Sequence, residues 1–159
     1  MKLGEIVTRK TVAAVLPATA KPQVIERLVD VLVKSGTLPA ARREVVLQAL
    51  AAREREMTTG VGLGIALPHA RIAGVDRILA ALGTCPAGID FDSLDGQPAT
   101  IFVLLVAPED MRKEHVQTLS EVSRLLGNAE SRAALLAAKT DSELWQALQD
   151  AERKTAKRR

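Results

Sequence analysis

The sequence is poor in cysteine and in aromatic residues. Its 159 residues include one cysteine, Cys85, two phenylalanines, one tryptophan and no tyrosine. A single cysteine excludes an intramolecular disulfide and is typical of proteins in a reducing compartment. The shortage of aromatic rings leaves little that could stack on nucleic acid bases. We therefore expect a cytoplasmic protein with no nucleic-acid partner.

Long apolar runs and a secretory signal pattern are also missing from the sequence. The longest uninterrupted apolar segment, residues 101–107, has the length of a strand, whereas a transmembrane helix needs about 20 apolar residues. The composition, 47% apolar and 26% charged, is that of an ordinary folded domain. A chain of this length suits one domain with its own core. We expect no direct membrane insertion.

The positive charge is concentrated at the C-terminal end of the chain. Residues 152–159 carry five Lys or Arg side chains and one carboxylate, a net charge of +4, so the rest of a chain that totals +3 carries −1. This distribution predicts a folded domain over residues 1–151, followed by a basic, disordered tail over residues 152–159.

Strand and helix patterns are mixed along the chain. The segment IFVLLV at residues 101–106 is apolar without alternation, as expected for a central strand buried on both faces. The sequence PAG at residues 86–88 predicts a turn after another strand over residues 77–84. No repeat or interdomain linker is visible, so we expect a single α/β domain with a central mixed sheet covered by helices. Further strands are predicted over residues 11–16 and 65–67, and helices over residues 22–34, 39–55, 112–126 and 129–139. A last helix is predicted to start with a capping box at residues 140–143, followed by apolar Leu144, Trp145 and Leu148.

The most distinctive stretch is TTGVGLGIALPHAR at residues 58–71. Glycines at every second position disfavour a helix and permit backbone conformations closed to other residues. Pro68 has no N–H and is predicted to end the pairing of a short buried strand, which delivers His69 to the strand end. The spacing G-x-G-x-G, after a charged helix and without a following Lys-Ser/Thr, does not fit a nucleotide-binding loop.

This stretch resembles the phosphorylation motif of enzyme IIA domains of the sugar phosphotransferase system, in the fructose, mannitol and nitrogen-regulatory class (type 2). The resemblance covers nearly the whole chain. It extends to GIDF at residues 88–91, LDGQP at 94–98, LLVAP at 104–108 and EHVQTL at 114–119.

The resemblance implies a three-layer α/β/α fold and a phosphocarrier function without a cofactor. The protein would accept a phosphoryl group from phosphorylated HPr on His69, then pass it to an enzyme IIB or use it as a signal to a regulated target protein. The second active-site histidine of the family matches His115. The family's Arg-Glu pair matches Arg53-Glu54, although Arg55-Glu56 offers a second register two residues later.

The chemistry of these residues fits that implication. A neutral imidazole nitrogen is a competent nucleophile near neutral pH, and phosphoryl transfer depends mainly on positioning and electrostatics. Arg53 could hold phosphate oxygens in a fork, and His115 lies in a first helical turn, which favours anions. No metal is required. Because glycine lets backbone N–H groups approach closely, the predicted phosphate-binding residues are Thr59, Gly60, Gly62 and Gly64.

Several alternatives remain open from the sequence. Residues 53–56 also fit a solvated helix end, and Asp90, Asp92 and Asp95 fit turn residues better than a metal or acid–base cluster. A zinc hydrolase using His69 and His115 lacks an obvious third ligand. A regulatory module, whose partner affinity is switched by phosphorylation of His69, competes with an active phosphocarrier. The 159 residues leave no room for an attached enzyme IIB domain, which keeps the regulatory version open.

Overall fold

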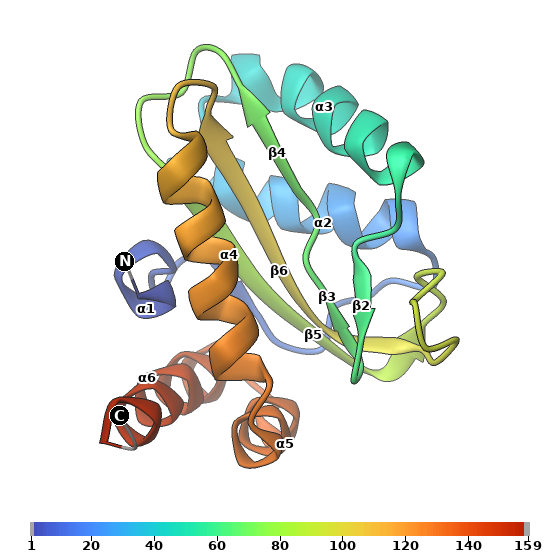
Figure 1. Ribbon diagram of the computed structural model, residues 1–159, viewed down its shortest axis with the longest axis vertical. Helices are drawn as coiled ribbons and strands as arrows, with labels where there is room; N and C mark the ends of the chain where they lie inside the picture. Colours follow the sequence, from blue (N-terminus) through green and yellow to red (C-terminus); the bar gives the residue numbers. More distant parts are fainter. Residues whose placement is uncertain (1, 158–159) are drawn as a thin grey trace.

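The structure is a computed structural model, and it describes residues 2–157. The chain folds into three layers. The middle layer is a six-stranded mixed sheet with the strand order β1-β5-β6-β3-β2, in which β4 also pairs with β6 (Figure 1). The predicted α/β/α architecture is therefore confirmed. The strands are β1 (Val12–Ala13), β2 (Gly60–Gly62), β3 (Ile65–Ala66), β4 (His69–Ile72), β5 (Leu79–Ile89) and β6 (Ala99–Pro108).

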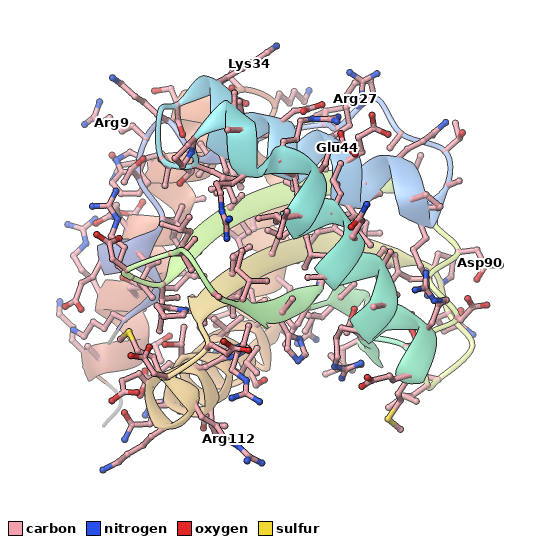
Figure 2. The ribbon with its side chains drawn as sticks, turned by 90° about the horizontal axis from the view of Figure 1, so that it is seen from above. Arg9, Arg27, Lys34, Glu44, Asp90 and Arg112 are labelled. Carbon is pink, nitrogen blue, oxygen red and sulfur yellow. The ribbon has the colours of Figure 1, made fainter. Side chains whose placement is uncertain are left out.

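Helices cover both faces of the sheet. Helices α2 (Lys21–Lys34) and α3 (Arg43–Glu56), the latter preceded by the 3₁₀ turn η1 (Ala40–Arg42), form one hydrophobic cluster with the sheet. Figure 2 shows these two helices on one side of the strands and Arg112, the first residue of α4 (Arg112–Leu126), on the other. The second cluster is formed by α1 (Leu3–Ile6), α4 (Arg112–Leu126), α5 (Ala129–Ala137) and α6 (Asp141–Lys157).

Strand β6 is the centre of the sheet. It pairs antiparallel with β5 and parallel with β3 and β4. Residues 101–107 are all 0% exposed, and successive side chains belong to the two clusters in turn. This explains why the segment is apolar without alternation, since each of its faces packs against helices.

Strands β3 and β4 lie one after the other along the same edge of β6. Ala66 pairs with Phe102, and His69 pairs with Leu105, whose N–H donates to the Pro68 carbonyl at 2.9 Å. Strand β3 ends at Ala66, one residue earlier than predicted, and the prediction that pairing stops at Pro68 is wrong, because the Pro68 carbonyl accepts a hydrogen bond from β6. His69 is thereby the first residue of a further strand.

The glycine stretch forms the β2–β3 hairpin. Its two-residue turn, Leu63-Gly64, has positive φ at both positions (59° and 76°), as in a type I′ turn. A Cβ on Gly64 would lie 2.9 Å from the Thr100 hydroxyl, and one on Gly60 would lie 2.5 Å from the Ser93 hydroxyl. These two glycines are therefore required by the hairpin and its packing against residues 93–100.

Two local predictions are wrong. Strand β5 does not end at residues 86–88 but runs to Ile89 through an irregularity after Thr84. Helix α6 continues to Lys157, and the Glu152 carboxylate accepts a 2.6 Å hydrogen bond from the Gly4 N–H, so residues 152–157 are not a disordered tail. Residues 158 and 159 lie outside the described residues. Within the described part, we find no helix of the length and apolar character that crossing a membrane requires.

Candidate phosphohistidine site

The structure brings the two histidines of the chain together. His69 is the first residue of β4, and His115 lies in the first turn of α4. Their ring centroids are 5.2 Å apart and the ring planes meet at 80°. His69 is half-buried, whereas His115 is 5% exposed. The two histidines predicted as site residues thus lie next to each other, with His69 as the more accessible one.

The protonation of His69 is set by the main chain. Its Nδ1 lies 2.7 Å from the Leu67 carbonyl oxygen. A carbonyl oxygen only accepts, so Nδ1 carries the hydrogen and Nε2 carries the lone pair. Burial lowers the pKa of His69, the bond to Leu67 opposes this, and the positive charge of Arg53 lowers the pKa further. The ring is therefore neutral at pH 7 with a nucleophilic Nε2.

His115 contains a buried polar atom without a partner. Its Nε2 has no hydrogen-bond partner among the described residues. Burial lowers the pKa of His115 to about 4, and the nearby His69 and Arg71 contribute in the same direction. An unsatisfied buried polar group costs about 1–3 kcal/mol. A phosphoryl oxygen bound beside the ring would satisfy this nitrogen when Nε2 carries the hydrogen.

Arg53 is the arginine of the charged helix end that acts on His69. It lies in the last turn of α3, and its Nη1 donates to the Met57 carbonyl at 2.7 Å. Arg55 instead lines a groove of about 570 Å³ between α2 and α3, together with Lys21. Arg53 is thus the arginine whose charge lowers the pKa of His69, and the choice between the registers Arg53-Glu54 and Arg55-Glu56 stays a prediction.

Glu54 does more than end a charged helix. Its nearly buried carboxylate accepts bonds from the Thr59 N–H (2.9 Å) and hydroxyl (2.6 Å) and pairs with Lys21 at 2.9 Å. Burial works to raise the pKa of Glu54, but the Thr59 and Lys21 hydrogen bonds outweigh it and the pKa is lowered. Glu54 thus ties the end of α3 to the segment before β2. The cationic partner of Glu54, Lys21, lies 33 residues earlier in the sequence, so no local pattern points to this role.

The other predicted phosphate ligands are not assembled around the histidines. The N–H and the hydroxyl of Thr59 both donate to Glu54, and the Gly60 N–H donates to the Thr58 hydroxyl at 3.1 Å. The Gly64 carbonyl accepts from Ile101 N–H, four residues before the Leu105 that pairs with His69. At about 3.3 Å per strand residue this is a separation of about 13 Å. Gly60 and Gly64 thus have a structural role in the hairpin and its packing, and phosphate binding by Thr59, Gly60, Gly62 and Gly64 stays a prediction.

The acidic residues near the hairpin stabilise turns by accepting hydrogen bonds from backbone N–H groups. Asp95 accepts hydrogen bonds from the Leu63 and Gln97 N–H groups, and Asp90 accepts one from the Asp92 N–H. Over residues 2–157, no group of three or more His, Cys, Asp or Glu side chains is arranged to hold a metal ion. The three protein ligands of a catalytic zinc site are not assembled there.

Residues 5–151 match the family model of the phosphoenolpyruvate-dependent sugar phosphotransferase system, EIIA 2. The chain is 31% identical over 150 residues to a nitrogen regulatory protein of Pseudomonas aeruginosa, covering 94% of this chain and 96% of that protein. It is 38% identical over 141 residues to the fructose-specific EIIABC component of Bacillus subtilis, covering 89% of this chain. The matched region is 22% of the length of that longer protein.

Solved structures agree with the sequence comparisons. The nitrogen regulatory protein IIA-Ntr of Neisseria meningitidis is similar with a TM-score of 0.81 and 27% identity, over 92% of this chain and 98% of that one. The mannitol IIA of Escherichia coli shares the fold, with a TM-score of 0.73 and 21% identity, over 89% of this chain and 97% of that one. The chain therefore belongs to the type 2 EIIA family of the phosphoenolpyruvate-dependent sugar phosphotransferase system.

Proposed function

We propose that this protein is a phosphocarrier that accepts a phosphoryl group on Nε2 of His69 from a phosphorylated HPr-type protein and passes it to an EIIB protein. One observation carries the assignment. The bond between Nδ1 and the Leu67 carbonyl leaves Nε2 of a neutral, half-buried ring with its lone pair free.

The transfer needs no proton to leave His69. The Nε2 lone pair attacks phosphorus, and the bond between phosphorus and the donor breaks with its electron pair going to the donor. Nδ1 keeps its hydrogen, and the Leu67 carbonyl at 2.7 Å supports the positive charge that develops on the ring. The same steps in reverse deliver the group to the next acceptor. Catalysis of this kind depends on position and on fixed charges.

Two further groups act on the transferred phosphoryl group in this proposal. His115, 5.2 Å from His69 between ring centroids, donates from its unpartnered Nε2 to a phosphoryl oxygen. Arg53 supplies positive charge from the end of α3 by exchanging its bond to the Met57 carbonyl for phosphoryl oxygens. The proposed roles are supported by the 5.2 Å between the two ring centroids and by the electrostatic effect of Arg53 on His69.

A regulatory function is the second candidate, and one comparison favours it. Relatives of nearly the same length as this chain are named nitrogen regulatory proteins, including those of Pseudomonas aeruginosa and Escherichia coli. In this version the phosphoryl group on His69 changes the affinity for a regulated target protein. The carrier version is supported by a complex of E. coli mannitol IIA with phosphorylated IIB, a fold relative at 20% identity.

The test is labelling by phosphoenolpyruvate, enzyme I and HPr, followed by mass spectrometry of the intact protein. We expect the mass of one phosphate on the wild type and on His115→Ala, and none on His69→Ala with an unchanged circular dichroism spectrum. Full labelling of His69→Ala would refute the assignment. Incubating the labelled protein with an isolated EIIB then separates the two versions, since only the carrier loses its label to EIIB at a catalytic rate.

A further inference from the structure

Arg71 lies on the same face of β4 as His69. Side chains alternate along a strand, and Ala70 and Ile72 pack in the cluster with α2 and α3. His69 and Arg71 therefore point to the other face. Their partners on β6, Leu105 and Ala107, belong to the cluster that contains α4. Two residues along a strand span about 6.6 Å, so an arginine side chain at residue 71 is long enough to reach the region of the His69 ring.

The Arg71 guanidinium is exposed and has spare hydrogen-bonding capacity. It makes one hydrogen bond in the described part of the chain, a long one of 3.4 Å from Nη1 to the Glu109 carbonyl. A guanidinium has five N–H donors in a planar fork that matches phosphate oxygens. Arg71 can thus bind an anion without giving up a strong interaction within the protein.

Each histidine of the pair has one arginine that acts on it. Arg53 acts electrostatically on His69 from the α3 side, and Arg71 acts on His115 from the strand side facing α4. His115 itself is neutral at pH 7, because burial lowers its pKa to about 4. A phosphoryl group arriving between the rings brings about two negative charges to the α4 side, where the buried histidine supplies none.

We propose that Arg71 is a second phosphate-binding arginine, which holds phosphoryl oxygens on the α4 side of the histidine pair while Arg53 acts from the α3 side. This role rests on the proposed use of His69 as the phosphoryl acceptor. It gives the site two cations on opposite sides of one phosphate. Arg71 is the last residue of the segment 58–71, and no pattern in the sequence points to this role.

The test uses inorganic phosphate as the probe and does not depend on phosphotransfer. Ring resonances of His69 and His115 are followed by NMR while phosphate is added to the full chain. Four proteins are compared: the wild type, Arg71→Ala, Arg71→Lys and Arg27→Ala. Arg27 is an exposed arginine on α2, on the opposite side of the sheet from α4 (Figure 2), and serves as the matched control.

We expect phosphate to shift both rings in the wild type and in Arg27→Ala. The Kd for inorganic phosphate should rise about tenfold in Arg71→Ala, which is the scale of one charged hydrogen bond. It should rise less in Arg71→Lys, which keeps the charge but loses the planar fork of N–H donors. Equal Kd values in the wild type and Arg71→Ala, or no response of the wild-type rings, would overturn the inference. If phosphate binds as expected but HPr leaves His69 unlabelled, the proposed function fails and the arginine site stands.

Discussion

The rings of His69 and His115 meet edge to face with 5.2 Å between their centroids, and they differ sharply in accessibility. His69 is half-buried and its Nδ1 is bound by a carbonyl, whereas His115 is 5% exposed with an unpartnered Nε2. The two imidazoles are therefore suited to different tasks. In the proposed function, His69 is the ring that a partner protein reaches, and the buried His115 acts on the phosphoryl group that His69 carries.

Replacing His115 with alanine should leave phosphorylation of His69 possible but slow onward transfer to EIIB about 100-fold. The reason is that one donor to the developing negative charge is lost, a change that costs on this scale in other enzymes. Single-turnover transfer from labelled protein to isolated EIIB measures it. Thr118→Ala, a buried site one turn further along α4 whose hydroxyl is bound to the Glu114 carbonyl, is the control. Onward transfer at the wild-type rate in His115→Ala would remove His115 from the mechanism.

Arg53→Ala and Arg55→Ala should behave differently. Arg53 acts on His69, and Arg55 lines the groove between α2 and α3. We expect Arg53→Ala to slow labelling by phospho-HPr about tenfold or more, the scale of a charged hydrogen bond, and to raise the pKa of His69. Arg55→Ala should match the wild type in both. Initial labelling rates and an NMR titration of the ring are the measurements, and identical behaviour of the two variants would contradict the Arg53 register.

Acid should destabilise the protein through His115. Its pKa is about 4 in the folded state and near 6.5 when unfolded, so the unfolded chain binds the proton first as pH falls. The stabilisation is complete above pH 6.5 and is lost progressively down to about pH 4. We expect a loss on the order of 1–3 kcal/mol.

The measurement is the free energy of unfolding in urea at several pH values between about 7.5 and about 4, which span the folded and unfolded pKa values of His115. The variant His115→Gln removes the titrating group and should flatten the curve. Its remaining slope includes His69, whose lowered pKa has the same sign of effect. Parallel curves for the variant and the wild type would show that folding does not lower the pKa of His115.

Gly64→Ala should weaken the fold without touching the chemistry. Gly64 and Gly96 both have positive φ (76° and 72°), but a Cβ on Gly64 meets the Thr100 hydroxyl at 2.9 Å while one on Gly96 meets nothing within 4 Å. We expect Gly96→Ala to cost about 1 kcal/mol from the backbone alone, and Gly64→Ala about 2 kcal/mol or more. Folded Gly64→Ala should be labelled by phospho-HPr at the wild-type rate. Loss of labelling with unchanged stability would return this glycine to the phosphate site.

The central strand β6 and helix α2 could be predicted from the local pattern of apolar residues. The apolar run of β6 and the apolar stripe of α2 each reveal which faces are buried, because burial repeats with the period of the element. Leu28 and Leu32, one helical turn apart, are both 0% exposed. The histidine pair was reachable only through the family resemblance, since nothing local links a residue after Pro68 to the start of a distant helix.

The parts that failed depend on contacts between distant segments. Strand β4 exists because β6 offers its edge beyond Phe102, and Glu54 is held by Lys21 from another helix. The continuation of α6 past Glu152 is accompanied by a bond from the Gly4 N–H at the other end of the chain. The role proposed for Arg71 was also out of reach of the sequence, because the pairing of β4 with β6 decides which face of the strand Arg71 lies on.

One consequence follows from the bond between His69 and residue 67. The oxygen that selects the reactive nitrogen belongs to the main chain, so no substitution of the Leu67 side chain can delete it. The surface around the ring can therefore diverge to suit new protein partners while the same atom stays poised for reaction. Recognition and reactivity are thus encoded in separable parts of the polypeptide, which allows one scaffold to serve either a transport chain or a signalling circuit.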